Sequence, residues 1–476
     1  MNKVDVQLDY NFSRPIDVQK NMNCFKDDDD ILNSSTNILL DKHSRALITD
    51  LYSCWKESED QFLTISMSKR GYKAKSRYNP NTISSYMINA IKLLKQKKMI
   101  DVYPGFYDAK RRISRLTRIK PSELIINRFK QYDFSPHQLL NSTKRECLYL
   151  IDKNSKLIEY EDNFETHEIR EVLRNYNLIL AKTFFDIPCL SSHYVKRGDG
   201  MKIIISDFCK IDNRRFENNW KNGGNFFGSW WHKLDIKSVN ELSNHMIIND
   251  SETSYIDFSN IFFEILFNKF EINMTGFDPR VLKKYFKFIK NDNQLNFIIS
   301  KSINSKNFSG LFKSISNERK RLGILEPVSK KEIQKLVDYI CKNYNQIYGL
   351  FFSNKKFDWD SIISEIFYNL LKDFGNASIN IPLIKVRDKF FFPTNIESNV
   401  LEYVKKSINK TMSLNQINIR TIKCCSYSKK SERSIFQSLN SNKLVYTKRF
   451  KDNKKVFINF MKKKNVWNNH LMNIGR

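Results

Sequence analysis

The sequence predicts an α+β protein with more than one domain. Its 476 residues are enough for roughly three domains of the usual size. Hydrophobic residues make up 41% of the chain and aromatic residues 13%, so burial can offset chain entropy and wholesale disorder is excluded. Strand-like and helix-like segments alternate over residues 216–412, which is typical of an α+β or α/β domain. A helix, helix, hairpin order over residues 36–130 predicts a separate small module.

The charge balance indicates a polyanionic partner. Lysine and arginine number 80 against 51 aspartates and glutamates, which gives a formal net charge of +29. Such an excess favours nucleic acid, although part of it agrees with the composition of an AT-rich genome. A membrane surface is the competing explanation, but there is no run of 18 apolar residues, and Glu264 interrupts the richest apolar segment. We therefore expect no membrane partner.

The start of the chain and its cysteines favour an intracellular protein. The first residues lack the basic start, apolar middle and cleavage site of a secretory signal. The eight cysteines include no CxxC pair, which argues against a disulfide framework or a zinc site. We expect a cytoplasmic protein, or one located in an organelle such as a plastid or mitochondrion.

A polar, acidic tail over residues 1–35 precedes two predicted helices. The first helix is expected over residues 39–55, where apolar residues recur at helical spacing. The second helix is expected to be capped by Thr82 or the asparagine before it. Its solvent face is basic and includes Lys92 and Lys95.

A basic hairpin follows the second helix. Residues 99–103 and 111–119 are predicted strands joined by a Pro-Gly turn. The second strand carries four arginines, namely Arg111, Arg112, Arg115 and Arg118. This order of elements is that of a winged helix, in which the second helix enters the major groove of DNA and the cations of the wing meet phosphate. We expect a DNA-binding, winged-helix-like module at 36–130, with docking of a partner protein as the alternative.

Two further regions flank the predicted core. Residues 131–215 form a connecting region with a charged helix over 167–180, to which we assign no chemistry. Residues 413–476 are basic, and the last 51 residues carry 13 lysines and arginines against 2 acidic residues. Aromatic residues interleaved with these cations suit stacking on single-stranded nucleic acid. A docked helix with a solvated basic face is the alternative.

Two aspartates are predicted at the ends of strands. Asp257 ends a β-rich segment just before an apolar helical stretch. Asp388 lies at the turn between the β-rich runs 384–386 and 390–392. A carboxylate at a strand end is well placed to hold a divalent cation. Two such carboxylates suit two-metal phosphoryl transfer, in which Mg²⁺ ions about 3.5 to 4 Å apart activate the attacking hydroxyl and stabilise the leaving oxygen.

A predicted helix between these aspartates carries cations and an aromatic ring. Arg280, Lys284 and Phe288 are four residues apart, so they are expected on one helical face. Two cations and a ring suit a clamp for a triphosphate and a stacking surface for a base. An ordinary helix face is the alternative.

In combination, these segments resemble the motifs of family A DNA polymerases. Residues 257–261, Asp-Phe-Ser-Asn-Ile, resemble motif A, which is written DYSQI. The three residues of the 278–290 segment fit RxxxKxxxF of motif B, and Arg387-Asp388 resembles the His-Asp of motif C. The similar region covers about residues 211–410.

A further segment strengthens this resemblance, and several positions depart from it. Residues 223–232, Gly-Gly-Asn-Phe-Phe-Gly-Ser-Trp-Trp-His, resemble the GGRFYGGWWQ block of compact, divergent polymerase-A-like proteins from bacteria and mobile elements. The departures from the family pattern are Asn225 for Arg, His232 for Gln, Phe262 for Glu, Glu264 for Arg, Asp292 for Tyr and Arg387 for His. These changes affect nucleotide or primer handling more than metal binding.

The resemblance implies a palm- and fingers-like core over residues 216–412. It implies that the two aspartates bind two Mg²⁺ ions, that Arg280 and Lys284 clamp the phosphates, and that Phe288 lies beside the incoming nucleotide. The implied activity is template-directed nucleotidyl transfer with deoxynucleotides and a DNA primer-template, in replication of a plasmid, phage, integrated element or small organellar genome. The first alternative is a catalytically degenerate DNA-binding replication or maintenance protein, and the second is an RNA-binding structural protein.

Overall fold

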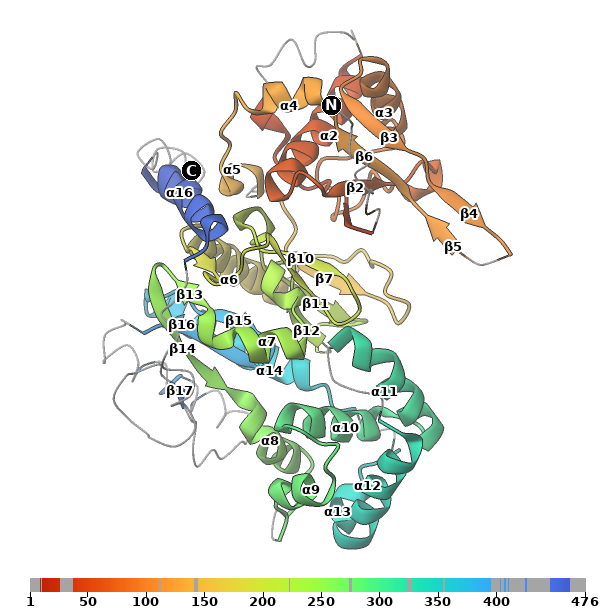
Figure 1. The fold of residues 1–476 in the computed structure, drawn as a ribbon, viewed down its shortest axis with the longest axis vertical. Helices are drawn as coiled ribbons and strands as arrows, with labels where there is room; N and C mark the ends of the chain where they lie inside the picture. The colour runs from red at the N-terminus through yellow and green to blue at the C-terminus, as the bar shows by residue number, and fades with distance from the viewer. Residues whose placement is uncertain are drawn as a thin grey trace.

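The computed structural model describes most of the chain between residues 37 and 394 and a helix near the C-terminus. The described residues are 9, 11–25, 37–110, 113–140, 144–221, 223–273, 276–322, 328–353, 356–394, 403, 406–407, 410, 424–425 and 446–462. Arg111, Arg112 and most of the basic region 413–476 lie outside them. The fold is α+β, as predicted, and Figure 1 shows a mixed N-terminal module, a central sheet region and a helical part along the long axis.

The N-terminal module has a hydrophobic core of its own. Two helices, α2 (Ile38–Glu57) and α3 (Met87–Gln96), contribute to that core together with a four-stranded sheet. The strand order is β1-β2-β6-β3, and β6 pairs antiparallel with both β2 and β3. The remaining elements of the module are β1 (Ser13–Pro15), β2 (Phe62–Ile65), β3 (Ile100–Tyr103), β6 (Thr117–Pro121), α4 (Glu123–Phe129) and α5 (Pro136–Leu140).

Both predicted helices of this module are confirmed, with one correction. The apolar positions of α3 face the core, as their spacing predicts. The predicted cap at Thr82 is wrong, because α3 begins after Tyr86. Thr82 has a φ of 49° and closes a turn by donating its amide to the Asn79 carbonyl at 2.8 Å. Thr82 therefore belongs to a turn that precedes α3 and does not cap the helix.

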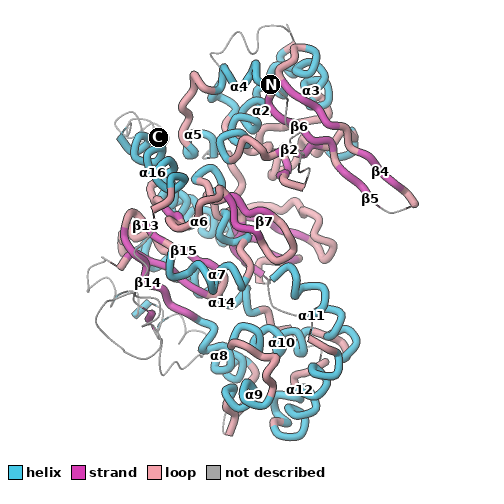
Figure 2. The backbone as a smooth tube through the Cα atoms, viewed as in Figure 1, coloured by secondary structure: helices cyan, strands magenta, loops and turns pink. Residues whose placement is uncertain are grey.

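The predicted basic hairpin is present and projects from the module, but its predicted Pro-Gly turn is wrong, because the chain reverses only after residue 108. The predicted strand over 111–119 is two strands, β5 (Ile113–Arg115) and β6, with Leu116 between them. β5 pairs antiparallel with β4 (Phe106–Asp108), and this two-stranded ribbon extends away from the rest of the module in Figures 1 and 2. Phe106 is about half exposed on it.

The connecting region and the predicted core share one sheet. β11 (Asn213–Glu217) pairs parallel with β7 (Leu148–Ile151) and antiparallel with β12 (Gly223–Phe227). The boundary predicted after residue 215 falls inside β11. Both regions contribute to one hydrophobic core, which also contains residues of α6 (Phe164–Ala181), the predicted charged helix. The two predicted regions therefore form a single folded unit.

A second sheet lies at the centre of this unit. Its order is β15-β16-β14-β13-β8, and each neighbouring pair is antiparallel. The strands are β8 (Phe185–Asp186), β13 (Ile247–Ile248), β14 (Ser251–Asp257), β15 (Ile384–Val386) and β16 (Lys389–Pro393), and β17 (Cys424–Cys425) also pairs with β14. A long helix, α14 (Trp359–Asn376), lies next to this sheet in Figure 1, and its Phe367 packs on Phe390 of β16.

Helices dominate the end of the molecule that is farthest from the N-terminal module (Figure 2). After β14 the chain forms α8 (Phe262–Lys269), α9 (Pro279–Tyr285), α10 (Asp292–Asn304), α11 (Phe308–Leu322), α12 (Lys330–Asn343) and α13 (Asn345–Tyr348). The capping box of Ser329 and Glu332 fixes the start of α12. Shorter elements elsewhere are β9 (Tyr194–Lys196), β10 (Lys202–Ile204), η3 (Asp207–Cys209), η4 (Trp230–Lys233), α7 (Ile236–Leu242), η5 (Ser243–His245) and η6 (Phe258–Ile261).

The last described helix, α16 (Lys448–Lys462), returns to the central unit. It lies beside α6 in Figure 1, and Phe450 packs on Phe184 with a ring separation of 5.7 Å. Over the described residues, the helices are all too short or too polar to cross a lipid bilayer.

Candidate active site

The structure brings Asp257 and Asp388 to the same edge of the central sheet. Asp257 is the last residue of β14, as predicted, and it pairs with Lys389 at the start of β16. Asp388 lies in the two-residue turn between β15 and β16, also as predicted. The amide of Phe258 donates to the Asp388 carbonyl at 3.0 Å. The two aspartates therefore lie next to each other although they are far apart in the sequence.

Aromatic packing fixes the register that brings the aspartates together. Phe258, directly after Asp257, packs on Phe390 with a ring separation of 4.6 Å, and both rings are fully buried. In the neighbouring position of β16, Phe391 packs on its cross-strand partner Tyr255, with a ring separation of 5.1 Å. A one-residue slip would turn these side chains to the opposite face of the sheet, so their burial strongly specifies the pairing.

The carboxylate of Asp257 is held in place by its neighbours. One of its oxygens accepts hydrogen bonds from the Ser259 amide at 2.9 Å and the Ser259 hydroxyl at 2.5 Å. Its other oxygen lies 3.6 Å from the ammonium of Lys389. Asp257 is thus both the end of β14 and the cap of the short helix η6.

The donor pair fits a divalent cation. Burial and, next, the nearby charge of Asp257 raise the pKa of Asp388 to about 6. A carboxylate whose pKa is raised by burial and by a neighbouring carboxylate is stabilised in its charged form by a bound cation. Within the described residues, no group of three or more His, Cys, Asp or Glu side chains is placed to hold a metal. Water or substrate oxygens would have to complete the coordination of an ion bound by these two aspartates.

A polar cleft of about 750 Å³ opens beside Asp388. Residues of β12, η4, α10, the start of α14 and the β15–β16 turn line it. The charged and polar groups contributed by α14, its cap, β15 and the turn are Asp358, Asp360, Ser364, Lys385, Arg387 and Asp388. The volume lies in the range of small-molecule sites, and the lining suits a charged ligand.

Three groups of the cleft were not predicted as site residues. Lys385 of β15 lines the cleft and is only 4% exposed. His232 of η4 also lines it, with Nε2 2.9 Å from Oδ2 of the fully buried Asp212. Asp358 caps α14, and burial followed by the charge of Asp360 raises its pKa. Lysine is rarely buried, so a lysine inside an apolar β-rich run is the sequence signal that could have marked Lys385 as a candidate site residue.

The predicted phosphate clamp lies apart from this cleft. Arg280 has a side chain that is 85% exposed and pairs with Asp278 at 2.9 Å. Lys284 is exposed as well, and neither cation is among the residues that line the cleft. The prediction that Phe288 shares a helical face with them is wrong, because α9 ends at Tyr285. Phe288 instead packs, partly buried, against the hydrophobic core.

The segment 223–232 serves both the core and the cleft. Trp230 and Trp231 are almost completely buried, and Trp230 stacks on Phe185 with a ring separation of 5.1 Å. Asn225 and His232, from the same segment, line the cleft. The tryptophans thus anchor a turn whose polar residues reach the candidate site.

The cations predicted to contact DNA are placed on the N-terminal module. Lys92 and Lys95 lie on α3 and are exposed. Arg115 belongs to the projecting ribbon, where its guanidinium lies 5.3 Å from the Phe106 ring centre. Arg118 lies on β6, and its guanidinium donates a hydrogen bond to the Leu116 carbonyl at 2.6 Å. These residues belong to the module and are absent from the lining of the cleft.

Phe450 and Phe457 of α16 are engaged in packing. Phe450 is 2% exposed, and Phe457 lies 5.2 Å from the ring of Phe184. The described part of the last 51 residues is therefore a docked helix, one of the two alternatives for it. Stacking of nucleic acid on Phe450 or Phe457 would require α16 to detach.

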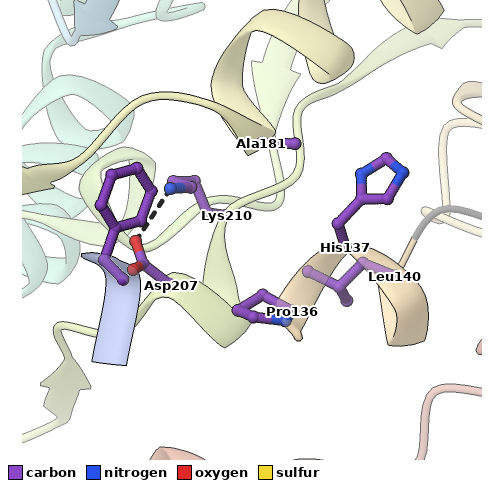
Figure 3. A pocket seen from close by; sticks show the side chains of 7 residues that line it. Pro136, His137, Leu140, Ala181, Asp207 and Lys210 are labelled. Carbon is purple, nitrogen blue, oxygen red and sulfur yellow. Dashed lines mark hydrogen bonds and ion pairs between the residues drawn. The ribbon is translucent and has the colours of Figure 1, made fainter. Parts of the chain in front are cut away.

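A smaller hollow lies where α5, α6 and α16 meet, and Figure 3 shows it from close by. Lys210 and Asp207 face each other there at 2.8 Å, and Pro136 and Leu140 of α5 form one side. Its volume of about 10 Å³ is that of a single water molecule at most. It is a packing gap between elements and has no room for a substrate.

Comparisons with known proteins assign no family to the chain. Neither the models of protein families, nor the curated proteins, nor the solved structures include a match to it. The resemblance to family A polymerases therefore stays a prediction, and the function is argued from the geometry of the site.

Proposed function

We propose that this protein is a template-directed nucleotidyltransferase that acts on DNA with two Mg²⁺ ions. The observation that carries the proposal is the pairing of β14 with β16, which brings Asp257 and Asp388 together at one sheet edge. Asp388 lies in the lining of a polar cleft large enough for a nucleotide. Burial and, next, the charge of Asp257 raise the pKa of Asp388, which supports a role of this carboxylate as a cation ligand.

In this proposal Asp257 and Asp388 would hold the metal ions. Bound Mg²⁺ supplies activation of the attacking hydroxyl and charge stabilisation of the phosphate. Ser259 keeps the carboxylate of Asp257 oriented through two hydrogen bonds. Lys385 and Arg387 add positive charge to the cleft wall beside Asp388, where the phosphates of a substrate would lie.

The N-terminal module supports DNA as the partner. In its sheet, β6 lies between β2 and β3, with α3 directly before β3 and a projecting ribbon between β3 and β6. This is the arrangement expected of a winged helix, with α3 in the position of the recognition helix. The exposed Lys92 and Lys95 would meet phosphates as α3 approaches the major groove.

A second candidate is a DNA-binding replication or maintenance protein without catalysis. The observation in its favour is the position of Arg280 and Lys284, which are exposed and outside the cleft. A chain that binds no nucleotide has no need for a phosphate clamp on α9, and the module alone would account for DNA binding.

Primer extension distinguishes the two candidates. The full chain is incubated with a short DNA primer-template, deoxynucleotides and Mg²⁺ or Mn²⁺, beside Asp257→Asn and Asp388→Asn. Asp338→Asn, an exposed carboxylate on α12, is the matched control. We expect extension by the wild type and the control, and a loss of at least about a thousandfold in both site variants. Absence of extension by the wild type, with intact salt-sensitive DNA binding, would favour the second candidate.

A further inference from the structure

Lys385 is exceptional among the buried lysines of the described chain. Four lysines are less than a tenth exposed, namely Lys20, Lys210, Lys385 and Lys389. Lys20 lies 3.3 Å from an Asp50 oxygen, Lys210 2.8 Å from an Asp207 oxygen, and Lys389 3.6 Å from an Asp257 oxygen. Within the described residues, Lys385 has neither a hydrogen bond nor an ion pair, although lysine is almost never buried without one.

The strand register directs Lys385 to the cleft side of the sheet. Lys385 pairs across the strands with Phe390, and paired residues share one face. Phe390 packs on Phe367 of α14, so this face is the one that meets α14. At the start of α14 the helix contributes Asp360 and Ser364 to the same cleft that Lys385 lines. The side chain is therefore held at the cleft by its strand.

The acids around Lys385 offset its burial only through space. Burial lowers the pKa of Lys385, and the cation of Arg387 acts in the same direction. Asp360, Asp388 and Asp212 oppose this effect through space, but none of them forms an ion pair with Lys385. Two of these acids, Asp360 and Asp388, face the cleft, and Asp388 is one of the proposed metal ligands. A cation bound by these acids would leave Lys385 with a still greater need for an anion.

We propose that Lys385 binds a phosphate group in the cleft, an inference that rests on the proposed function. The phosphate belongs either to the polyphosphate of a nucleotide or to the backbone of a nucleic acid strand. The cleft of about 750 Å³ admits both, and Lys385 is a compact point charge of the kind that contacts phosphate. Lys385 would thus take the phosphate-binding role that the resemblance implies for Lys284.

Measuring the binding of phosphate-containing ligands to the chain tests this inference without any catalytic step. The full chain is titrated in EDTA with inorganic tripolyphosphate and, separately, with a short single-stranded oligonucleotide. Lys385→Met is compared with Lys356→Met, which removes the same charge from an exposed position of the cleft lining. We expect Lys385→Met to weaken one of the two ligands by roughly tenfold to a hundredfold, and Lys356→Met to have a smaller effect.

Each outcome decides the inference. Weakening of tripolyphosphate alone assigns the site to the nucleotide, and weakening of the oligonucleotide alone assigns it to the strand. Unchanged binding of both, or an equal effect of Lys356→Met, would overturn the proposal. Removal of a buried charge that has no ion-pair partner should also leave the thermal midpoint of the free chain unchanged or raise it. A fall in the midpoint of Lys385→Met would show that the fold already compensates the charge, and would overturn the proposal too.

The outcome is separate from that of the primer-extension experiment. Binding in EDTA requires no metal at Asp257 and Asp388. If extension depends on Asp388 but Lys385→Met binds phosphate normally, the proposed function stands and this inference fails. If Lys385→Met binds phosphate poorly and the wild type extends no primer, the phosphate site stands and the polymerase function fails.

Discussion

Arg449 of α16 forms a buried ion pair with Asp186 of β8. The shortest distance between their side chains is 2.7 Å, and each side chain is 2% exposed. Arg449 also donates hydrogen bonds to the carbonyls of Ile187 and Leu190. This pair fastens the last described helix to the strand at the far end of the central sheet.

The variant Arg449→Met should detach α16 from the sheet. Asp186 would keep a buried charge without its cation, so we expect the free energy of unfolding to fall by about 3 kcal/mol. Thermal unfolding and limited proteolysis around residues 446–462 measure the effect. Lys451→Met, at an exposed position of the same helix, is the control, and an equal loss in both variants would contradict the buried-pair account.

Asp388 should make the stability of the chain depend on pH. Its pKa is about 6 in the folded chain against 3.8 for the unfolded group, so the folded state binds more protons between these values. The free energy of unfolding therefore falls as pH rises through this window. We expect Asp388→Asn to be more stable than the wild type above about pH 6, by on the order of 2 kcal/mol, and equal to it below about pH 4.

Chemical denaturation at several pH values, without divalent metal, measures this difference. Adding Mg²⁺ should stabilise the wild type and leave Asp388→Asn unchanged, because the variant lacks one of the two proposed ligands. A variant that is less stable than the wild type at neutral pH would show that the ionised carboxylate is already well compensated, and would argue against a cation site.

Gly228 should be intolerant of a side chain. Its φ is +119°, and an added Cβ would lie 2.3 Å from the Ile211 carbonyl oxygen. We expect Gly228→Ala to lower the free energy of unfolding by more than about 1 kcal/mol, since both strain and a backbone clash oppose it. Gly200, with a φ of +88° and open space around it, is the matched control, so Gly200→Ala should cost less. Chemical denaturation of both variants provides the comparison, and equal costs would contradict the predicted clash.

Lys92 and Lys95 should contribute to DNA binding through phosphate contacts. We expect the double variant Lys92→Gln/Lys95→Gln to bind duplex DNA more weakly and to reduce the salt dependence of the affinity by about one to two counterions. Binding to a labelled duplex at several salt concentrations measures the slope. The control is Lys331→Gln/Lys335→Gln, which removes two exposed charges from one turn of another helix, α12. Equal losses in both double variants would indicate that net charge, rather than the module, governs binding.

Local sequence patterns predicted the elements that carry the two aspartates. The end of β14 at Asp257 is visible because a β-rich segment gives way to an apolar helical one. The turn at Asp388 is visible because polar residues interrupt two β-rich runs. The helices α2 and α3 follow the same logic of apolar spacing.

Longer-range features could not be predicted in this way. The parallel pairing of β7 with β11 joins segments that no local pattern connects, so the predicted boundary after residue 215 falls inside a strand. The end of α9 at Tyr285 depends on the tertiary contacts of the following aromatic residues, and helical spacing alone extended it to Phe288. The cleft position of Lys385 requires the sheet register and α14 together.

The order in which the central sheet is made has a consequence for protein synthesis. β14 leaves the ribosome well before β16, the strand that covers one of its edges. Until Lys389–Pro393 is synthesised, that edge presents unpaired backbone groups to any extended chain nearby. Fragments that stop short of β16 should therefore aggregate when expressed, and they cannot serve as minimal active versions of this protein.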